Sequence, residues 1–376
     1  MKIVIVFSSC LYFIILNRAI INTNNLSKRY LTLNMHQISA KTTKDQKVLL
    51  TGTTPSGTPH VGNYIGAIKP ALEMARQPEL KSYFFIADYH SLIKLWEPRL
   101  RRKYIYEMAA TWLSLGLDIN RTVFYRQSDI PEILEVNWIL TSVTAKGLLN
   151  RSHAYKAILN FNQRCNQKYF DTGVTMGLFN YPMLMAADII TFNADLVPVG
   201  KDQIQHIEIA RDIVNRFNNI YQTQLLKVPE AVIDDKTLIV KGLDGQKMSK
   251  SHNNTIPLFC NSKQLHKLIM SIVTNSQPPA EPKSIKNCII FSLYQKFADP
   301  AEVSEFSKFY QQGISWRDAK FILFEKMDKI LSPARQQYED LLAHPEVIDI
   351  HLNLGAEKAR MDARKLLTKI KTIIGL

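Results

Sequence analysis

The segment Lys247-Met248-Ser249-Lys250-Ser251 has the most distinctive pattern of reactive side chains in the sequence. Its lysines lie three positions apart among small residues, which suits a mobile loop that grips a polyphosphate, because each ammonium group is a compact positive charge. Gly242 and Gly245 supply further loop residues just upstream. A chance match to all five residues is expected in roughly one sequence in ten thousand. The segment therefore predicts a polyphosphate-binding loop.

A second candidate site lies directly after the first predicted strand, residues 48–50. The turn-rich sequence TGTTPSG at 51–57 leads to His60-Val61-Gly62-Asn63, where a helical pattern begins. A helix that begins after a strand presents free N–H groups to phosphate, and Gly62 lets a flat adenine ring approach the backbone because it has no Cβ. A lone histidine at a helix start is usually a cap or a surface residue. The prediction of a nucleotide site therefore depends on the position after the strand.

Strands alternate with helices up to about residue 254. Buried strands are predicted at 48–50, 83–87, 122–125 and 196–199, with helices from about 62, over 104–115 and from about 207. This alternation predicts an α/β fold with a Rossmann-type doubly wound parallel sheet. Ligands bind such sheets beyond the carboxyl ends of the strands. The polar turns after Leu50, Ala87 and Val199 are therefore expected to form the site.

The composition changes after about Asn254, where the strand pattern fades and helices rich in lysine and arginine follow. We predict three parts from these changes. Residues 1–46 are an N-terminal extension that we interpret as separate from the functional protein. Residues 47–255 are a Rossmann catalytic domain with an inserted helical segment and the lysine-rich loop. Residues 256–376 are a helical domain, whose last helix is expected to pack back on the catalytic domain.

The chain is strongly basic, with a net charge of +14 over 376 residues, and 46% of its residues are apolar. The apolar fraction excludes disordered and collagen-like classes, and the charge favours polyanionic partners such as nucleic acid. The four cysteines are scattered, with no C-x-x-C pair and no histidine at ligand spacing. We therefore predict no structural metal, no disulfide framework and a reducing compartment.

The N-terminus has three interpretations. The apolar run at 3–16 resembles the core of a signal peptide but lacks a convincing cleavage site, and it is shorter than the roughly 20 residues that span a bilayer. No acidic residue precedes Asp45, as in organellar transit peptides. We favour the third interpretation, in which Met35 is the functional start, because the recognisable chemistry begins at Lys47. We accordingly expect no membrane association and a cytoplasmic location, with a mitochondrial location as the alternative.

The histidine and lysine elements, in this order around a βαβ region, resemble the HIGH and KMSKS signatures of the class I aminoacyl-tRNA synthetases. Further blocks resemble the tryptophanyl-tRNA synthetase family of bacterial or organellar type, at residues 55–57, 62–67, 85–90, 181–189 and 197–203. Tyrosyl-tRNA synthetase is an alternative with the same architecture, although the Ala186-Ala187-Asp188 block points away from it. A non-catalytic RNA-binding paralogue is a second alternative, but His60 and both loop lysines are present.

The resemblance implies an ATP-dependent tryptophan–tRNA ligase. Such an enzyme converts L-tryptophan and ATP, bound as its Mg²⁺ complex, to tryptophanyl-adenylate and diphosphate, and then transfers the acyl group to tRNA(Trp). It also implies that the helical domain binds the tRNA anticodon and that the enzyme is a homodimer.

The resemblance assigns site residues one by one. The catalytic group would be His60, Asn63, Lys247 and Lys250. The ATP-binding set would be Pro55, Ser56, Gly57, His60, Gly62, Asn63, Gly200, Asp202, Lys247, Met248, Ser249, Lys250 and Ser251. The amino-acid pocket would be formed by His90, Tyr181, Met185, Asp188, Val199 and Gln203.

Asp188 is the most informative member of the predicted pocket. An indole ring has one donor, its N–H group, and a buried carboxylate would accept from it. A site built for such a bond discriminates against a ligand without the donor by a factor of about 10⁴–10⁵.

The roles of two other positions are less well defined. Thr54 stands where the family often has glutamine, and Lys156 is the candidate for a catalytic lysine expected between Leu148 and Gln163.

Overall fold

The structure is a computed structural model that describes residues 46–233 and 240–376. Lys47–Leu376 forms one compact unit. The predictions for the apolar run at 3–16 and for a start at Met35 lie outside the described residues. In the part of the chain that is described, no helix is long and apolar enough to cross a membrane. The functional division at residue 255 stays a prediction.

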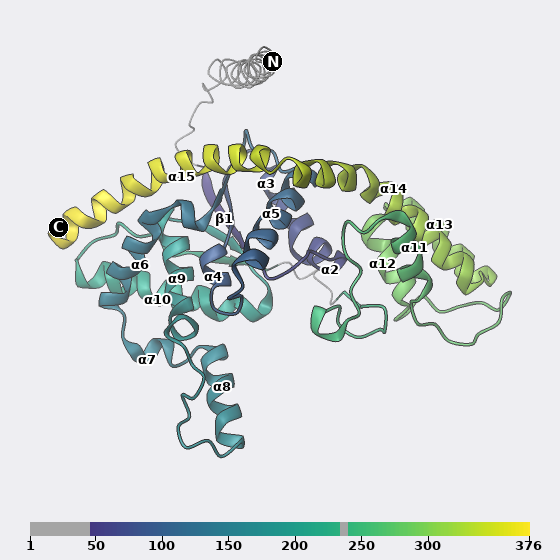
Figure 1. The fold of residues 1–376 in the computed structure, drawn as a ribbon, viewed down its shortest axis with the longest axis horizontal. Coiled ribbons are helices and arrows are strands. Elements are labelled where there is room, and N and C mark those ends of the chain that lie inside the picture. Colours follow the sequence, from purple (N-terminus) through teal and green to yellow (C-terminus); the bar gives the residue numbers. More distant parts are fainter. Residues whose placement is uncertain (1–45, 234–239) are drawn as a thin grey trace, which may run out of the picture. The chain divides into compact units, whose positions relative to one another are not determined.

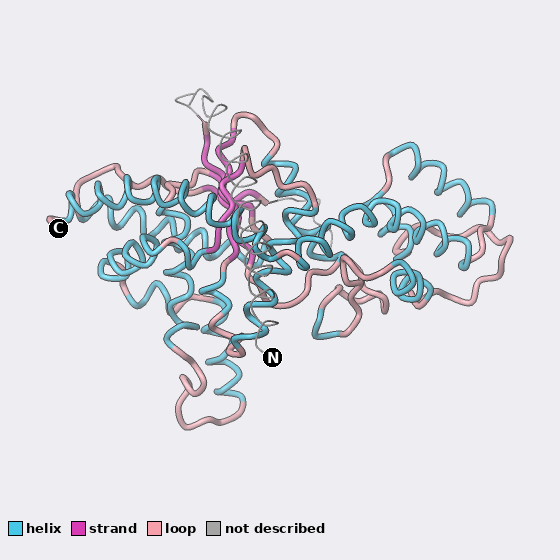
Figure 2. The backbone as a smooth tube through the Cα atoms, turned by 45° about the horizontal axis from the view of Figure 1, so that its top comes forward, coloured by secondary structure: helices cyan, strands magenta, loops and turns pink. Residues whose placement is uncertain are grey.

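A parallel sheet forms the centre of this unit, with its five strands in the order β3-β2-β1-β4-β5 (Figures 1 and 2). The strands are β1 (Lys47–Thr53), β2 (Leu80–Ile86), β3 (Thr122–Arg126), β4 (Leu196–Pro198) and β5 (Glu230–Val232). β1 pairs in parallel with β2 on one side and with β4 on the other. The strand order changes direction between β1 and β4, and a doubly wound sheet opens its ligand crevice at that point. The predicted fold class is confirmed.

Helices connect the successive strands. Between β1 and β2 a continuous helical stretch consists of α2 (Val61–Asn63), the π-helical turn η1 (Tyr64–Ile68) and α3 (Lys69–Ala75), and β2 is followed by α4 (Asp88–Ser91) and α5 (Pro98–Ser114). Between β3 and β4 lie η2 (Gln127–Asp129), α6 (Pro131–Val143), α7 (Lys146–Leu149), α8 (His153–Arg164) and α9 (Met176–Thr191). η3 (Lys201–Gln203) and α10 (Ile204–Ile220) lead to β5. The predicted apolar stripe of α10 is buried, at Ile207, Ala210, Val214 and Phe217.

The chain after β5 is helical in the described residues 240–376. It contains η4 (Lys250–His252), α11 (Ser262–Met270), α12 (Ile289–Phe297), α13 (Pro300–Gln312), α14 (Trp316–Ala343) and α15 (Pro345–Ile374). α14 packs against α5, α11 and α12, whereas α15 lies along β3 and α6 (Figure 1). Gly355 permits the contact with the sheet, because a Cβ at this position would collide with the carbonyl oxygen of Phe124 in β3.

The sequence did not predict β5 or the π-helical turn. β5 is three residues long, and its side chains are exposed or half-buried. Such a short strand shows neither the alternation nor the apolar run by which strands are recognised in a sequence. The π-helical turn keeps the same apolar face as the helix around it, so the sequence predicts a helix there without showing the wider turn.

Candidate active site

The loop that follows β1 and the lysine-rich loop are held together. The Val61 N–H donates a hydrogen bond to the Ile256 carbonyl at 2.9 Å. Met248 is buried, and its Sδ lies 3.2 Å from the backbone nitrogen of Gly62. The predicted phosphate-binding elements therefore form one site at the carboxyl end of β1.

Lys250 occupies the space that Gly57 leaves open. Gly57 has a φ of +136°, which L side chains rarely adopt, and a Cβ there would lie 2.7 Å from Nζ of Lys250. Partial burial lowers the pKa of Lys250, while the negative charge of Glu107 acts in the opposite direction. The missing side chain at Gly57 thus gives the Lys250 ammonium group its place in the site.

His60 stands at the start of α2 and is buried. Its backbone N–H donates to Oδ1 of Asn63 at 3.0 Å, which fixes the first turn of the helix. Burial, together with the charge of Lys250, lowers the pKa of His60 to about 4, so the ring is neutral at pH 7. Its buried Nδ1 has no hydrogen-bond partner among the described residues. An unpaired buried ring nitrogen calls for a partner that the described residues do not supply, such as a water or a ligand atom.

Asn254 stabilises the lysine-rich loop through hydrogen bonds within it. Its Oδ1 accepts from the Ser249 N–H at 2.8 Å, and its Nδ2 donates to Asp244 at 2.7 Å and to the Lys247 carbonyl at 3.1 Å. Asn254 is buried, whereas the side chains of Lys247 and Ser251 are exposed. The loop backbone is therefore fixed, while its outer side chains remain accessible to a ligand.

Three of the six residues predicted to form the amino-acid pocket lie on α9. Tyr181, Met185 and Asp188 are spaced at i, i+4 and i+7 and so share one helix face. Asp188 is only 1% exposed. Gln127 Nε2 donates to both of its oxygens, at 2.7 and 2.9 Å, and His90 Nε2 lies 2.9 Å from Oδ2. Burial raises the pKa of Asp188, and these partners oppose the shift by favouring the carboxylate.

The turn after β4 adjoins Tyr181. Gln203 Nε2 donates to Asp202 at 2.9 Å, and a Cβ at Gly200 would lie 2.7 Å from the Asp202 carboxylate. The Tyr181 hydroxyl lies 2.8 Å from Nε2 of the buried His206. Burial lowers the pKa of His206, and the charge of Asp202 acts against that shift. The Asp202 carboxylate of this turn is therefore close to both Tyr181 of α9 and His206 of α10.

Of the other predicted residues, Pro55, Ser56 and Val199 lie in the loops that follow β1 and β4. Pro55 is buried and Ser56 is exposed in the loop after β1, and the Val199 N–H donates to the Val232 carbonyl at 3.0 Å. Lys156 is exposed on α8. Among the described residues, no cluster of three or more His, Cys, Asp and Glu side chains is arranged to hold a metal ion.

Three residues of the site were missed in the sequence: Gln127, His206 and Asn254. A single buried amide or imidazole has no periodic pattern, and its importance comes from partners distant in the chain. One signal was available for Gln127. It directly follows a buried strand, as the predicted site residues after β1, β2 and β4 do.

Comparison with known proteins identifies the family. The model of the family described as class I tRNA synthetases (W and Y) matches residues 42–368. The tryptophan–tRNA ligase of Neisseria meningitidis is 49% identical over 331 residues, which cover 88% of this chain and 98% of the relative. The chain belongs to the tryptophanyl-tRNA synthetase family. The ligase of Pseudomonas aeruginosa is also 49% identical, over 87% of this chain and 73% of the relative.

Solved structures of this family have the same fold. A tryptophanyl-tRNA synthetase from Campylobacter jejuni, crystallised with ADP and tryptophan, has a TM-score of 0.78 at 40% identity. The match covers 88% of this chain and 100% of that chain. A tyrosyl-tRNA synthetase from Archaeoglobus fulgidus, at 18% identity and a TM-score of 0.58, shares the fold alone.

Proposed function

We propose that this synthetase activates L-tryptophan with ATP and transfers it to tRNA(Trp). The observation that carries the proposal is the Asp188 carboxylate, which is buried on α9 and held by Gln127 and His90. A carboxylate fixed in an apolar setting is a specific acceptor for the indole N–H. Among the amino-acid substrates, only tryptophan carries an indole.

The site after β1 binds ATP in this proposal. Lys250, which fills the space at Gly57, and neutral His60, which lies beside Gly62 at the start of α2, face the nucleotide. Asp202, beside Gly200, binds the ribose hydroxyls as a carboxylate acceptor. Lys247 and Lys250 stabilise the charge that develops on the leaving diphosphate. The remaining predicted contacts of the nucleotide are Pro55, Ser56, Asn63, Met248, Ser249 and Ser251.

The reaction requires positioning and charge stabilisation rather than an enzyme nucleophile. The tryptophan carboxylate attacks the α-phosphorus of ATP in line, and the bond to the diphosphate breaks. The substrate is held by Asp188 at its indole end and by Tyr181 and Gln203 towards the turn after β4, with His90, Met185 and Val199 lining the pocket. Mg²⁺ enters as part of the ATP complex, bound through phosphate oxygens, and neutralises part of the phosphate charge.

We assign tRNA binding to the helical residues 256–376. Some basic side chains of α15 are unsuitable for this role, because they already bind carboxylates of the same chain. Arg360 and Arg364 both contact Glu132, and Lys371 contacts Glu135. Exposed basic residues on the helices before α15 include Lys263, Lys267, Lys308, Arg317 and Lys329, and Lys358 and Lys369 of α15 are exposed as well.

We propose that the enzyme is a homodimer, as the family resemblance implies. Leu134 and Trp138 are exposed at i and i+4 on α6, with Trp138 71% exposed, and this apolar pair suits a contact with a second copy. We place the enzyme in the cytoplasm, with the mitochondrion as the alternative.

Charging of tRNA tests the complete proposal. The protein, ATP and labelled tryptophan should convert a tRNA(Trp) transcript to acid-precipitable aminoacyl-tRNA, while a tRNA(Tyr) transcript should stay uncharged. Adenylate formation without transfer to tRNA(Trp) would contradict the proposed ligase.

We expect Gly57→Ala to slow adenylate formation roughly 10- to 100-fold, because displacing a catalytic group by about 1 Å has an effect of this size. Tryptophan binding should change little. Gly116→Ala is the matched control, since Gly116 has a φ of +87° and open space at the Cβ position. Single-turnover adenylate formation and tryptophan titration measure the two effects. Equal losses in both variants would show that backbone strain, and not the place of Lys250, is responsible.

We also predict that a protein starting at Met35 retains full adenylate formation. The strand that carries the site begins at Lys47, and Lys47–Leu376 forms a compact unit. Pyrophosphate exchange and solubility, compared with the 376-residue chain, provide the test. Loss of soluble, active enzyme upon this truncation would overturn our interpretation of the N-terminus.

A further inference from the structure

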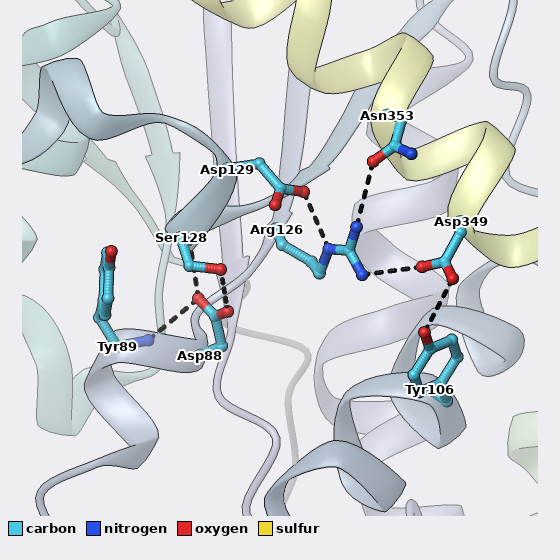
Figure 3. A network of polar contacts seen from close by, with 8 residues as sticks. All are labelled: Asp88, Tyr89, Tyr106, Arg126, Ser128, Asp129, Asp349 and Asn353. Carbon is cyan, nitrogen blue, oxygen red and sulfur yellow. Dashed lines mark hydrogen bonds and ion pairs between the residues drawn. The ribbon is translucent and has the colours of Figure 1, made fainter.

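The four residues Arg126–Asp129, which we call the β3 turn, connect the tryptophan pocket with the C-terminal helix. Arg126 is the last residue of β3, and the next three form η2. Figure 3 shows that Arg126 points towards α15, while Ser128 faces Asp88 on α4. Gln127, which is fully buried, points the other way and donates to both oxygens of Asp188. Neighbouring residues at a strand end project to opposite faces, so one turn serves both sides.

Both partners of Asp188 depend on the β3 turn. Gln127 belongs to it. His90 lies on α4, which is fastened to the turn because the Asp88 carboxylate accepts from the Ser128 N–H at 3.0 Å and from its hydroxyl. The Gln127 side-chain oxygen also accepts from the Tyr89 N–H at 3.2 Å. A shift of the turn would therefore move both donors that orient the Asp188 carboxylate.

On the other side of the β3 turn, side chains of α15 hydrogen-bond to Arg126 (Figure 3). Arg126 Nη1 donates to Asp349 and Nη2 donates to Asn353, at 2.8 and 3.1 Å. Asp349 also accepts from the Tyr106 hydroxyl of α5 at 2.9 Å. The Arg126 side chain is 19% exposed, so its ion pairs are shielded from water better than typical surface pairs. Asp129 binds the remaining guanidinium edge at 2.8 Å.

The backbone of α15 is fixed at the same place. Gly355 lies against the backbone carbonyl of Phe124, which is two residues before Arg126 in β3. A Cβ at position 355 would collide with this carbonyl oxygen. The helix is thus seated on β3 by a backbone contact and on the β3 turn by charged hydrogen bonds. A helix in direct contact with a strand sets the position of that strand's end more firmly than a loop contact does.

We propose that α15 positions the carboxylate that reads the indole N–H, through Asp349, Arg126 and the β3 turn. Asp349 is accordingly a specificity-positioning residue that does not touch the substrate. The inference depends on the proposed role of Asp188. It predicts that breaking the Asp349–Arg126 contact lowers discrimination for the ring N–H, although the contact lies outside the pocket.

The chain offers a matched control on the same helix. Asp362 fastens α15 to β2, where it accepts from Lys81 and from the Tyr83 hydroxyl, both at 2.7 Å. Among the described residues, none of these three makes a hydrogen bond or an ion pair with the β3 turn. Asp362→Ala therefore loosens the helix without releasing Arg126, whereas Asp349→Ala releases Arg126.

The test compares kcat/KM for tryptophan with that for its analogue carrying sulfur in place of the ring N–H. In pyrophosphate exchange, Asp349→Ala should reduce the tryptophan preference roughly 3- to 30-fold, the size expected for coupled neighbouring groups. Asp362→Ala should leave the preference within about twofold of the wild type. Asp349→Asn keeps an acceptor for Arg126 and should retain most of the preference. If Asp349→Ala is insoluble, Arg126→Lys is the test variant, because a lysine cannot bridge Asp349 and Asn353 as the planar guanidinium does.

Two outcomes overturn the inference: an unchanged preference in Asp349→Ala, or the same loss in Asp362→Ala. If Asp349→Ala is insoluble, an unchanged preference in Arg126→Lys has the same consequence, and a reduced preference supports the inference. Measurements on the wild-type enzyme distinguish a failure of this inference from a failure of the proposed function. A wild-type enzyme that treats the two substrates alike, or that does not activate tryptophan, contradicts the role of Asp188 itself.

Discussion

Replacing Lys250 by alanine is expected to slow adenylate formation by roughly two to three orders of magnitude, the typical loss when one group that stabilises developing charge is removed. Lys250 is an exposed residue whose ammonium end lies against Gly57, and partial burial of that end lowers its pKa. Its charge matters most as the diphosphate departs. An interaction that is stronger in the transition state than in the ground state changes kcat more than binding.

Single-turnover adenylate formation and equilibrium binding of tryptophan separate the two effects of Lys250→Ala. Lys263→Ala is a suitable control, because it removes the same charge from an exposed position on α11. We expect the control to match the wild type in both measurements. Weakened tryptophan binding with an unchanged activation rate would refute the assigned role of Lys250.

Replacing Asp188 by alanine is the second change with a large expected effect. The specificity constant for tryptophan should fall by roughly two to four orders of magnitude, because the indole N–H loses its buried acceptor. The variant also leaves Gln127 and His90 without their shared partner. Unsatisfied buried donors each cost about 1–3 kcal/mol, so the free energy of unfolding should decrease as well. Circular dichroism at the assay temperature confirms that the variant is folded.

The sulfur analogue of tryptophan isolates the indole contact in this variant. The wild type should use the analogue poorly, because the carboxylate of Asp188 faces a group that cannot donate. In Asp188→Ala that disadvantage should largely disappear, because the acceptor left unpaired is gone. The comparison is a double-mutant cycle with one partner on the ligand. If the substrates differ by the same factor in both enzymes, Asp188 does not read the indole nitrogen.

The sequence predicted the parts of the site that depend on local patterns. A strand followed by a polar turn locates a ligand crevice in a parallel sheet, and this places His60, His90 and Asp202 after β1, β2 and β4. Tyr181 and Asp188 were assigned to the pocket by the family resemblance, and the structure places them on one face of α9. The inference from strands and turns needs only neighbours in the chain and the regular geometry of a parallel sheet.

The interactions that hold the site depend on contacts between distant segments, which a single sequence does not reveal. Gln127 and Asp188 are 61 positions apart, and Arg126 and Asp349 are 223 apart. The basic residues of α15 illustrate the same limit. Their number suggests RNA binding, but Arg360 and Arg364 neutralise the buried Glu132 of α6. A charged side chain pairs with whatever the fold brings next to it.

Amino-acid-dependent exchange of labelled pyrophosphate into ATP, measured with each of the twenty amino acids, is the most direct test of tryptophan activation. We expect rapid exchange with tryptophan and negligible exchange with tyrosine or phenylalanine, because neither carries an indole donor for Asp188. Exchange that tyrosine supports as well as tryptophan does, or no exchange with any amino acid, would contradict the proposed function.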